Sequence, residues 1–146
     1  MDFLTALKIS SSGLSAQRIR MNVISANLTN IDTTRTPEGG PYRRKDVIFA
    51  ATQVNSPFQN ILESQIKGRV YQVNVEGIYY DNSPSRLKYD PGHPDANDEG
   101  YVALPNITVI EEMINMLSAT RSYEANVTAI NATKNMALKA LEIGRG

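Results

Sequence analysis

Apolar side chains in the last third of the chain recur at alternating steps of four and three residues. This spacing is typical of a helix whose apolar seam packs on another helix, as in a coiled coil. No proline or glycine interrupts the stretch between Pro105 and Gly144, and Thr108 and Glu111 have the spacing of a capping box. The pattern therefore predicts one helix from Thr108 to Ile143. We expect subunit packing through its seam residues Met113, Met116, Tyr123, Val127, Ile130 and Leu141.

The first 31 residues carry a second heptad pattern, which is the natural partner of the last helix. Its weak point is Ser10 to Gly13, because hydroxyl groups compete for backbone hydrogen bonds and glycine costs a helix about 1 kcal/mol relative to alanine. We therefore expect fraying or a bend before Leu14. The seam residues expected to pack in this helix are Leu7, Leu14, Met21, Ile24 and Leu28.

The outer face of this first helix carries few charges. Up to Ile31, the charged residues are Asp2, Lys8, Arg18 and Arg20, and the other polar positions are small and neutral. A helix face in water usually has more interspersed charges. A plain polar surface is one interpretation. The one we favour is that both faces are covered in the working state, the second by neighbouring subunits.

The middle of the chain predicts short strands between turns. Turn-forming residues from Asp32 to Pro41 end the first helix, and residues 42–51, 69–80 and 101–104 are rich in β-branched and aromatic side chains. The sequence thus predicts an α+β protein, with long terminal helices pairing as a coiled coil and a small β-rich insertion between them. We expect a helical domain of residues 1–34 and 106–146, and an insertion domain of residues 35–105.

Composition narrows the function classes. Lys plus Arg and Asp plus Glu both number 15, so no overall field favours nucleic acid or an anionic membrane as a partner. The absence of cysteine removes disulfides, thiolate catalysis and cysteine-based zinc sites. No apolar stretch reaches the length of a membrane span, and the first residues lack the pattern of a cleaved signal peptide. We therefore expect neither a membrane-spanning segment nor a cleaved signal peptide.

Candidate chemical sites are weak. His93 is the single histidine, so catalysis or metal binding through it would lack histidine or cysteine partners, and we expect a rigid turn that packs on a neighbour. The acidic segment that starts at Asp95 has the spacing of the first half of a calcium-binding EF-hand loop. Asn106, however, occupies the twelfth position of that loop, where a bidentate glutamate is required. A solvated acidic turn is therefore favoured over a calcium site.

The triplet Arg43-Arg44-Lys45 is the strongest local concentration of positive charge. Without interleaved aromatic residues beyond Tyr42 it is a poor nucleic-acid site, and we favour a solvated strand or a salt-bridge face between subunits. No phosphate-binding glycine motif occurs, and a Ser-His-Asp set has no convincing candidates. The sequence predicts no enzyme, cofactor, metal or small-molecule substrate.

Both ends of the chain carry motifs that resemble bacterial flagellar rod, hook and hook-associated proteins. At the N-terminal end these are residues 12–17 and 22–34. The stretch from Tyr89 to Ala96, with residues 100–106 and 118–126, is more specifically similar to the proximal-rod members of this family. The motif positions that we single out are Ser12, Gly13, Leu14, Ala26, Asn27, Asn30, Asp90, Pro91, Gly92, Pro94, Arg121 and Tyr123.

The resemblance implies a structural subunit of the proximal rod, the axial drive shaft of the flagellar basal body, that serves motility. Such a subunit would be exported unfolded through the flagellar type III export apparatus, without cleavage. It would assemble helically in the periplasm, through its terminal helices, on copies of itself and other rod proteins. Two alternatives stay open: another small flagellar rod protein, or a soluble coiled-coil binding module or export chaperone.

Overall fold

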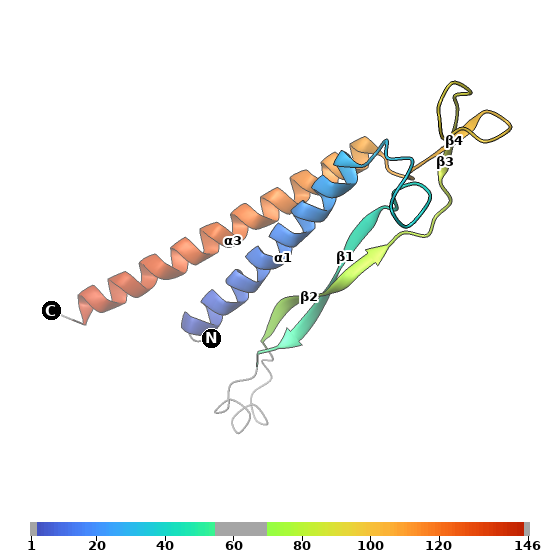
Figure 1. Cartoon of the computed structure of the whole chain (residues 1–146). Helices are drawn as coiled ribbons and strands as arrows, with labels where there is room; N and C mark the ends of the chain where they lie inside the picture. Colours follow the sequence, from blue (N-terminus) through green and yellow to red (C-terminus); the bar gives the residue numbers. More distant parts are fainter. Residues whose placement is uncertain (1–2, 55–69, 145–146) are drawn as a thin grey trace. The chain divides into compact units, whose positions relative to one another are not determined.

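The computed structural model describes residues 3–54 and 70–144, and in these residues short strands lie between two long helices in chain order (Figure 1). This arrangement confirms the predicted α+β class. The elements are α1 (Phe3–Thr29), β1 (Lys45–Gln53), β2 (Tyr71–Tyr80), β3 (Arg86–Tyr89), β4 (Tyr101–Leu104) and α3 (Val109–Ile143).

Helix α3 confirms the helix predicted from Thr108 to Ile143. The carbonyl of Thr108 accepts the first helical hydrogen bond, from the Glu112 amide at 3.1 Å, so Thr108 occupies the position before the first turn. The Gly144 amide donates to the Ala140 carbonyl at 3.1 Å just after the last helical residue. Neither α1 nor α3, as far as the structure describes them, is long and apolar enough to cross a membrane.

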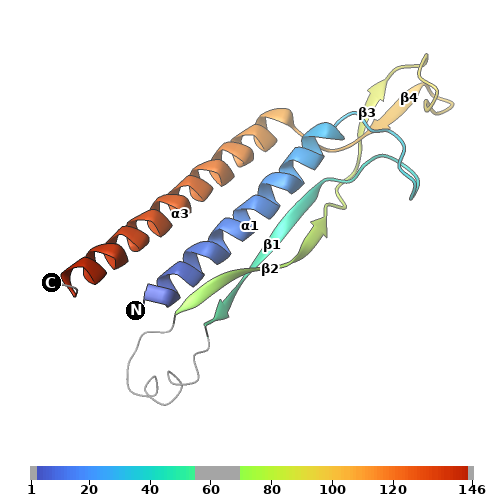
Figure 2. The same ribbon diagram turned by 60° about the vertical axis from the view of Figure 1, so that its left-hand side comes forward.

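Helix α1 continues straight and without interruption through Ser10 to Gly13 (Figure 2), so the fraying or bend predicted before Leu14 is wrong. The Ser12 hydroxyl donates to the Ile9 carbonyl at 2.7 Å and accepts a hydrogen bond from the Val73 amide at 3.2 Å. Gly13 lies against the side chain of Asn126 in α3. Contacts with β2 and α3 therefore offset the low helix propensity of this segment.

The strands form two separate pairs. β1 pairs with β2, and the two run in opposite directions (Figure 1). β3 pairs antiparallel with β4, which places Tyr89 opposite Tyr101. The sequence prediction missed β3, because its four residues are all exposed and show no alternation. Arg69, the first residue of the second predicted strand, lies outside the described residues.

Contacts divide the chain into two units. The first contains Met1–Arg18, Phe49–Glu76 and Thr120–Gly146, and the second contains Ile19–Ile48 and Gly77–Ala119. Each unit thus combines helix and strand. The sequence-based division into residues 1–34 with 106–146 and residues 35–105 follows the elements instead, and it stays a prediction.

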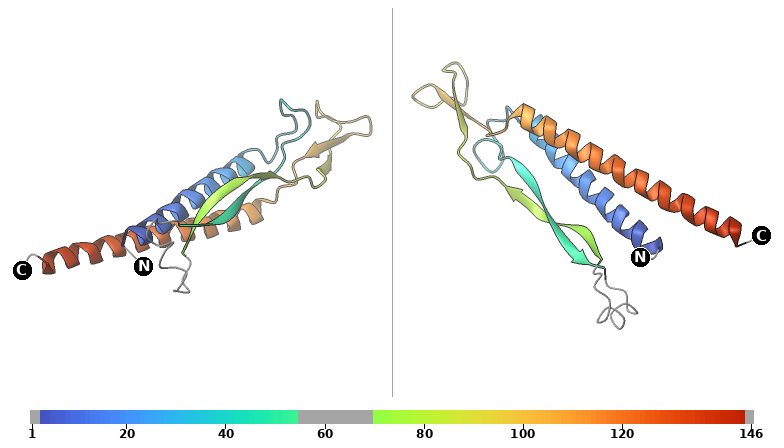
Figure 3. Two further views of the ribbon diagram at one scale, coloured as in Figure 1. Left: turned by 90° about the horizontal axis from the view of Figure 1, so that it is seen from below. Right: turned by 180° about the vertical axis from the view of Figure 1, so that it is seen from behind.

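Within each unit, the α1 segment lies between the α3 segment and the β1–β2 segment (Figure 3). In the first unit β2 contacts α1 through Ser12, and in the second unit β1 contacts α1 through the side chain of Asn27. Strands of the same chain therefore lie against one flank of α1, whereas Ser11, Ser15, Asn22 and Ser25 stay exposed. That neighbouring subunits cover this exposed face stays a prediction.

Candidate functional site

The seam residues predicted for packing fall into buried and exposed groups. In α1, Ile24 is buried, and Leu7, Leu14, Met21 and Leu28 are partly buried. In α3, Met116, Tyr123, Val127 and Ile130 are partly buried. Met113 and Leu141 differ, because they are 59% and 65% exposed. Both are therefore available to a neighbouring molecule.

The inward face of α3 is set by two columns of residues seven apart. One column is Met116, Tyr123, Ile130 and Ala137, which the predicted seam contains. The other is Glu112, Ala119, Asn126 and Thr133, one residue earlier than the predicted column that starts at Met113. This second column is mostly polar, so apolar spacing could not detect it.

A continuous apolar surface remains uncovered at the start of α3. Its residues are between 45% and 69% exposed. Ile110, Ile114 and Leu117 lie on the side of the helix away from Glu112, and Val109 and Met113 flank them. Exposed apolar patches of this kind mark sites of protein interaction. We call this surface the apolar stripe; it consists of Val109, Ile110, Met113, Ile114 and Leu117.

Directly behind the apolar stripe, the second unit contains a buried polar cluster centred on Glu112. The Glu112 side chain is only 1% exposed. Its Oε1 atom accepts a hydrogen bond from Arg44 Nε at 2.8 Å and lies 2.8 Å from Arg44 Nη2, with which it forms an ion pair. Its Oε2 atom accepts a hydrogen bond from Asn27 Nδ2 at 3.0 Å. Both carboxylate oxygens are therefore satisfied inside the chain.

Asn27, which is 0% exposed, connects this cluster to β1. Its Nδ2 donates to the Lys45 carbonyl at 2.8 Å, and its Oδ1 accepts from the Lys45 amide at 2.9 Å. The Asn27 side chain thus pairs with the first residue of β1 as a neighbouring strand would. The Tyr42 hydroxyl also donates to Oδ1, at 3.2 Å. One amide therefore holds α1, β1 and α3 together.

The basic triplet does not form one continuous charged face, because Arg44 points into the chain and pairs with the buried Glu112. Burial lowers the pKa of the Arg44 guanidinium, but the hydrogen bonds and charges of Glu112 and Asp46 together outweigh burial and raise that pKa overall. Arg44 also forms an ion pair with Asp46 at 3.3 Å. The Lys45 ammonium lies 5.3 Å from the ring centroids of both Tyr42 and Tyr80. For Arg44, the solvated strand and the salt bridge between subunits are both corrected to an internal ion pair.

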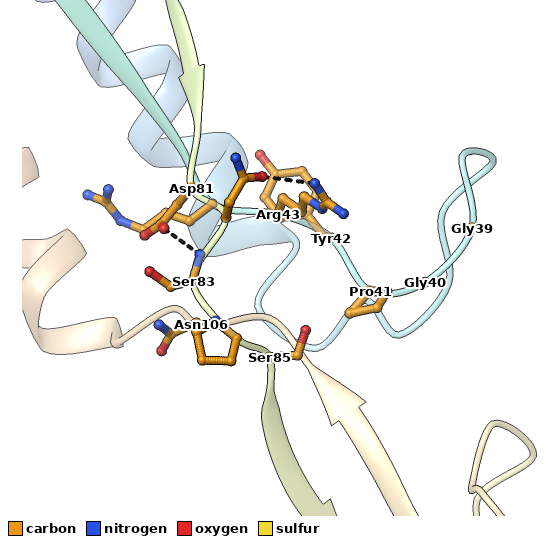
Figure 4. Close-up of a pocket in the computed structure, with 12 residues that line it drawn as sticks. Gly39, Gly40, Pro41, Tyr42, Arg43, Asp81, Ser83, Ser85 and Asn106 are labelled. Carbon is orange, nitrogen blue, oxygen red and sulfur yellow. Dashed lines mark hydrogen bonds between the residues drawn. The ribbon is translucent and has the colours of Figure 1, made fainter.

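A polar hollow of about 340 Å³ lies beside the triplet (Figure 4). It is lined by residues 39–44 and 81–85 and by Asn106. Arg43 donates to Asn82 Oδ1 at 2.9 Å, and the Ser83 amide donates to Asp81 Oδ1 at 2.8 Å. Arg44 is engaged by Glu112. The charged groups of the hollow therefore already bond within the chain.

The loop between β3 and β4 forms the turn predicted around His93. The His93 amide donates to the Asp90 carbonyl at 3.1 Å, and His93 Nδ1 accepts from the Asp95 amide at 3.1 Å. The Asp95 carboxylate accepts a hydrogen bond from the Thr34 hydroxyl at 2.8 Å, which ties the turn to the loop that follows α1. Among the described residues, no three acidic, histidine or cysteine side chains gather as a metal ion requires.

The motif residues occupy distinct structural positions. Gly13 contacts α3, and Asn27 lies at the centre of the polar cluster. Asn30 Nδ2 donates a hydrogen bond to the Ala26 carbonyl at 2.8 Å, at the end of α1. Asp90 begins the His93 turn, which includes Pro91, Gly92 and Pro94. Ser12 contacts β2, Arg121 is exposed, and Tyr123 is partly buried. The sequence prediction did not identify the Glu112–Arg44 pair, because the predicted seam ran through Met113 and left Glu112 outside it.

Comparisons with known proteins agree with both ends of the chain. Residues 7–35 match a family model described as flagella basal body rod protein. Residues 98–143 match a second model, described as flagellar basal body rod FlgEFG protein C-terminal. The two matches contain α1 and α3 almost completely.

Curated relatives extend the match over the whole length. The chain is 46% identical to the flagellar basal-body rod protein FlgC of Borreliella burgdorferi, covering 100% of both chains. It is 50% identical to FlgC of Bacillus subtilis, over 96% of this chain and 97% of the relative. Identity with FlgC of Salmonella typhimurium is 40%, over 99% of this chain and 100% of the relative. The chain with the apolar stripe and the Glu112 cluster therefore belongs to the FlgC family of flagellar basal-body rod proteins, as a structural rod subunit.

Proposed function

We propose that the chain builds the proximal part of the rod in the periplasm, by packing its terminal helices helically against copies of itself and other rod proteins. It reaches this place through the flagellar type III export apparatus, without cleavage of a signal peptide. Its contribution to motility is mechanical, as part of the axial drive shaft, and it is not an enzyme. The apolar stripe of α3 is the observation that carries this proposal.

The apolar stripe has the composition of a protein interface. Ile110, Ile114 and Met113 are 69%, 62% and 59% exposed, although isoleucine and methionine are usually buried. Removing apolar surface from water stabilises a contact by about 25 cal/mol per Å². A neighbouring rod subunit that covers these side chains would therefore gain a substantial part of its binding free energy here.

The first unit offers a second, separate apolar surface. A hollow of about 690 Å³ lies between Phe3 and Ala6 of α1 and residues 133–141 of α3. Leu4, Leu138 and Leu141 are exposed nearby in the same unit. Two unlike apolar surfaces on one chain favour heterologous contacts, which produce open helical stacks instead of closed dimers. Such a stack is the geometry that an axial rod needs.

The experiment that tests this proposal compares Ile114→Asp with Ile114→Leu in motile cells. Aspartate places a charge in the apolar stripe, so we expect loss of swimming and loss of the subunit from purified basal bodies. Leucine keeps the side chain apolar and should preserve both. Export is measured separately, as the amount of each variant outside the cytoplasm, and we expect it to be equal for the two. Wild-type swimming by Ile114→Asp would contradict the proposal.

Cell fractionation separates the remaining alternatives. An export chaperone or coiled-coil module would stay in the cytoplasm and be absent from basal bodies. Another rod position would leave the chain in basal bodies but change the stage at which assembly stops when the gene is deleted. For a proximal subunit, we expect no later rod or hook protein to assemble in the deletion strain.

A further inference from the structure

We propose that the Glu112–Arg44 pair is a folding lock, which lets the start of α3 dock on α1 only after β1 and β2 have paired. The lock would control when the apolar stripe becomes an ordered helical surface. That consequence rests on the proposed function, whereas the lock itself is a property of the isolated chain.

The first element of the lock is the burial of Glu112. Its side chain is 1% exposed, and its neighbours in α3 on the other side, Met113 and Ile114, belong to the apolar stripe. Turning Glu112 inward therefore turns the stripe outward. A buried carboxylate without a positive partner is strongly unfavourable. The first turns of α3 therefore dock stably only when the Arg44 guanidinium is present.

The second element is that Arg44 is positioned by the strand pair. Its carbonyl accepts a hydrogen bond from the Asp81 amide at 2.8 Å, just beyond the end of β2. The next residue, Lys45, is held through its amide and carbonyl by the Asn27 side chain. Pairing of β1 with β2 and docking of β1 on α1 thus bring the guanidinium to the place where Glu112 needs it.

The groups facing Glu112 carry little other charge. From the segment before β1 come Arg44 and the Tyr42 hydroxyl, and Asp46 lies beyond Arg44, with which it pairs at 3.3 Å. From α1 comes Asn27, which is uncharged. Arg44 is therefore the positive partner within this cluster. Removing it leaves the Glu112 carboxylate buried without a positive partner, which is strongly unfavourable.

The test uses hydrogen exchange measured by NMR on the purified full-length chain, expressed as protection factors corrected for the intrinsic rate. In Arg44→Met we expect amides of residues 112–119 to lose about tenfold or more in protection at neutral pH, while β1 amides change much less. A loss confined to residues 112–119 would show that docking of these turns depends on Arg44 while the strand pair persists.

A double variant keeps the lock testable if Arg44→Met weakens the whole fold. Replacing a buried ion pair by apolar residues of similar size is often neutral or stabilising. We therefore expect Arg44→Met with Glu112→Met to recover protection at residues 112–119. Asp46→Asn is the matched control, because it removes only the more exposed partner of Arg44, and it should leave protection as in the wild type.

Three results would overturn the lock. The first is unchanged protection at residues 112–119 in Arg44→Met. The second is a loss of protection that is equally large in β1. The third is a double variant no better protected than Arg44→Met. None of these measurements involves assembly, so the lock can fail while Ile114→Asp still blocks rod formation, and the reverse also holds.

Discussion

Gly13 of α1 lies so close to Asn126 of α3 that a Cβ atom at Gly13 would be 3.0 Å from both polar atoms of the Asn126 amide. The amide itself is held, because its Nδ2 donates to the Ser122 carbonyl at 2.9 Å. Glycine in a helix is unfavourable by itself. Here the missing side chain allows the two helices of the first unit to approach closely, which explains a glycine in the middle of α1.

This contact predicts that Gly13→Ala destabilises the chain by about 1 kcal/mol, although alanine is the better helix former. In an Asn126→Ala background the steric conflict is removed, so the same substitution should stabilise the chain by up to about 1 kcal/mol. Urea unfolding of the four proteins in this double-mutant cycle gives both values.

Gly77→Ala is the matched control for this cycle. A Cβ at Gly77 in β2 would meet no atom within 4 Å, so its substitution should change the free energy of unfolding little. If Gly13→Ala stabilises the wild-type chain as much as the Asn126→Ala chain, then close packing is not the reason for glycine at this position.

The terminal helices and most strands could be predicted, because their periodicity is local. The continuity of α1 through Ser10 to Gly13 could not, since its compensation comes from Val73 and Asn126, which are distant in sequence. Helix propensity describes a segment without such tertiary contacts. A weak segment with a glycine and hydroxyl groups is therefore a candidate for close packing as well as for fraying.

The packing face of α3 was predicted in part for a different reason. Apolar spacing finds columns of apolar residues, and it found the column of Met116, Tyr123 and Ile130. The other inward column contains Glu112 and Asn126, whose burial depends on partners in other elements. Because Met113 and Ile114 are as apolar as core residues, sequence alone could not separate the outward stripe from the core.

Asn27 offers a direct test of the polar cluster. In the wild type, Asn27 Nδ2 lies 3.0 Å from Glu112 Oε2 and also donates to the Lys45 carbonyl. Asn27→Asp would replace this donor by a carboxylate oxygen, which places a second negative charge next to Glu112 and removes both hydrogen bonds. We expect the free energy of unfolding to fall by about 3 kcal/mol or more, as when a buried charge is left unpaired. Thermal unfolding followed by circular dichroism measures the loss.

Asn22→Asp makes the same chemical change on an exposed position of the same helix. It should alter the free energy of unfolding by less than about 0.5 kcal/mol, as is usual for surface substitutions. Equal losses in the two variants would mean that the negative charge on α1, and not its burial beside Glu112, destabilises the chain.

Gly100 and Gly40 separate backbone strain from steric conflict. Both have positive φ angles, of 81° and 75°. At Gly40 a Cβ would meet nothing within 4 Å, whereas at Gly100 it would lie 2.9 Å from Cε2 of Tyr89. We expect Gly40→Ala to cost about 1 kcal/mol and Gly100→Ala about 2 to 3 kcal/mol, because the second adds displacement of the ring to the unfavourable φ.

The ring contact gives this comparison a local measurement. Tyr89 and Tyr101 meet edge to face, with ring centroids 5.3 Å apart. In Gly100→Ala, we expect the aromatic proton shifts of both tyrosines to move toward those of exposed tyrosine, whereas Gly40→Ala should leave them unchanged. Equal costs for the two glycines, with both rings unmoved, would remove the steric explanation for Gly100.

The turn after β2 makes a prediction about pH. Hydrogen bonds from the Ser83 hydroxyl and amide, with a smaller contribution from the charge of Arg44, lower the pKa of the Asp81 carboxyl below its ordinary value of 3.8. A lowered pKa in the folded chain means that the stabilisation is present above the ordinary pKa and is lost as pH falls through the lowered one. The turn should thus persist to more acidic pH than an unperturbed carboxyl would allow.

The Ser83 amide reports this titration, because it donates to Asp81 Oδ1 at 2.8 Å. We expect its NMR shift to change with a midpoint below 3.8. In Asp81→Asn the amide oxygen can still accept the hydrogen bond but does not ionise, so the shift should stay constant over this range. A midpoint at or above 3.8 in the wild type would show that the turn does not stabilise the Asp81 carboxylate. The hydrogen bonds from Ser83 would then be too weak in solution to help hold Asp81 at the end of β2, where its amide donates to the Arg44 carbonyl.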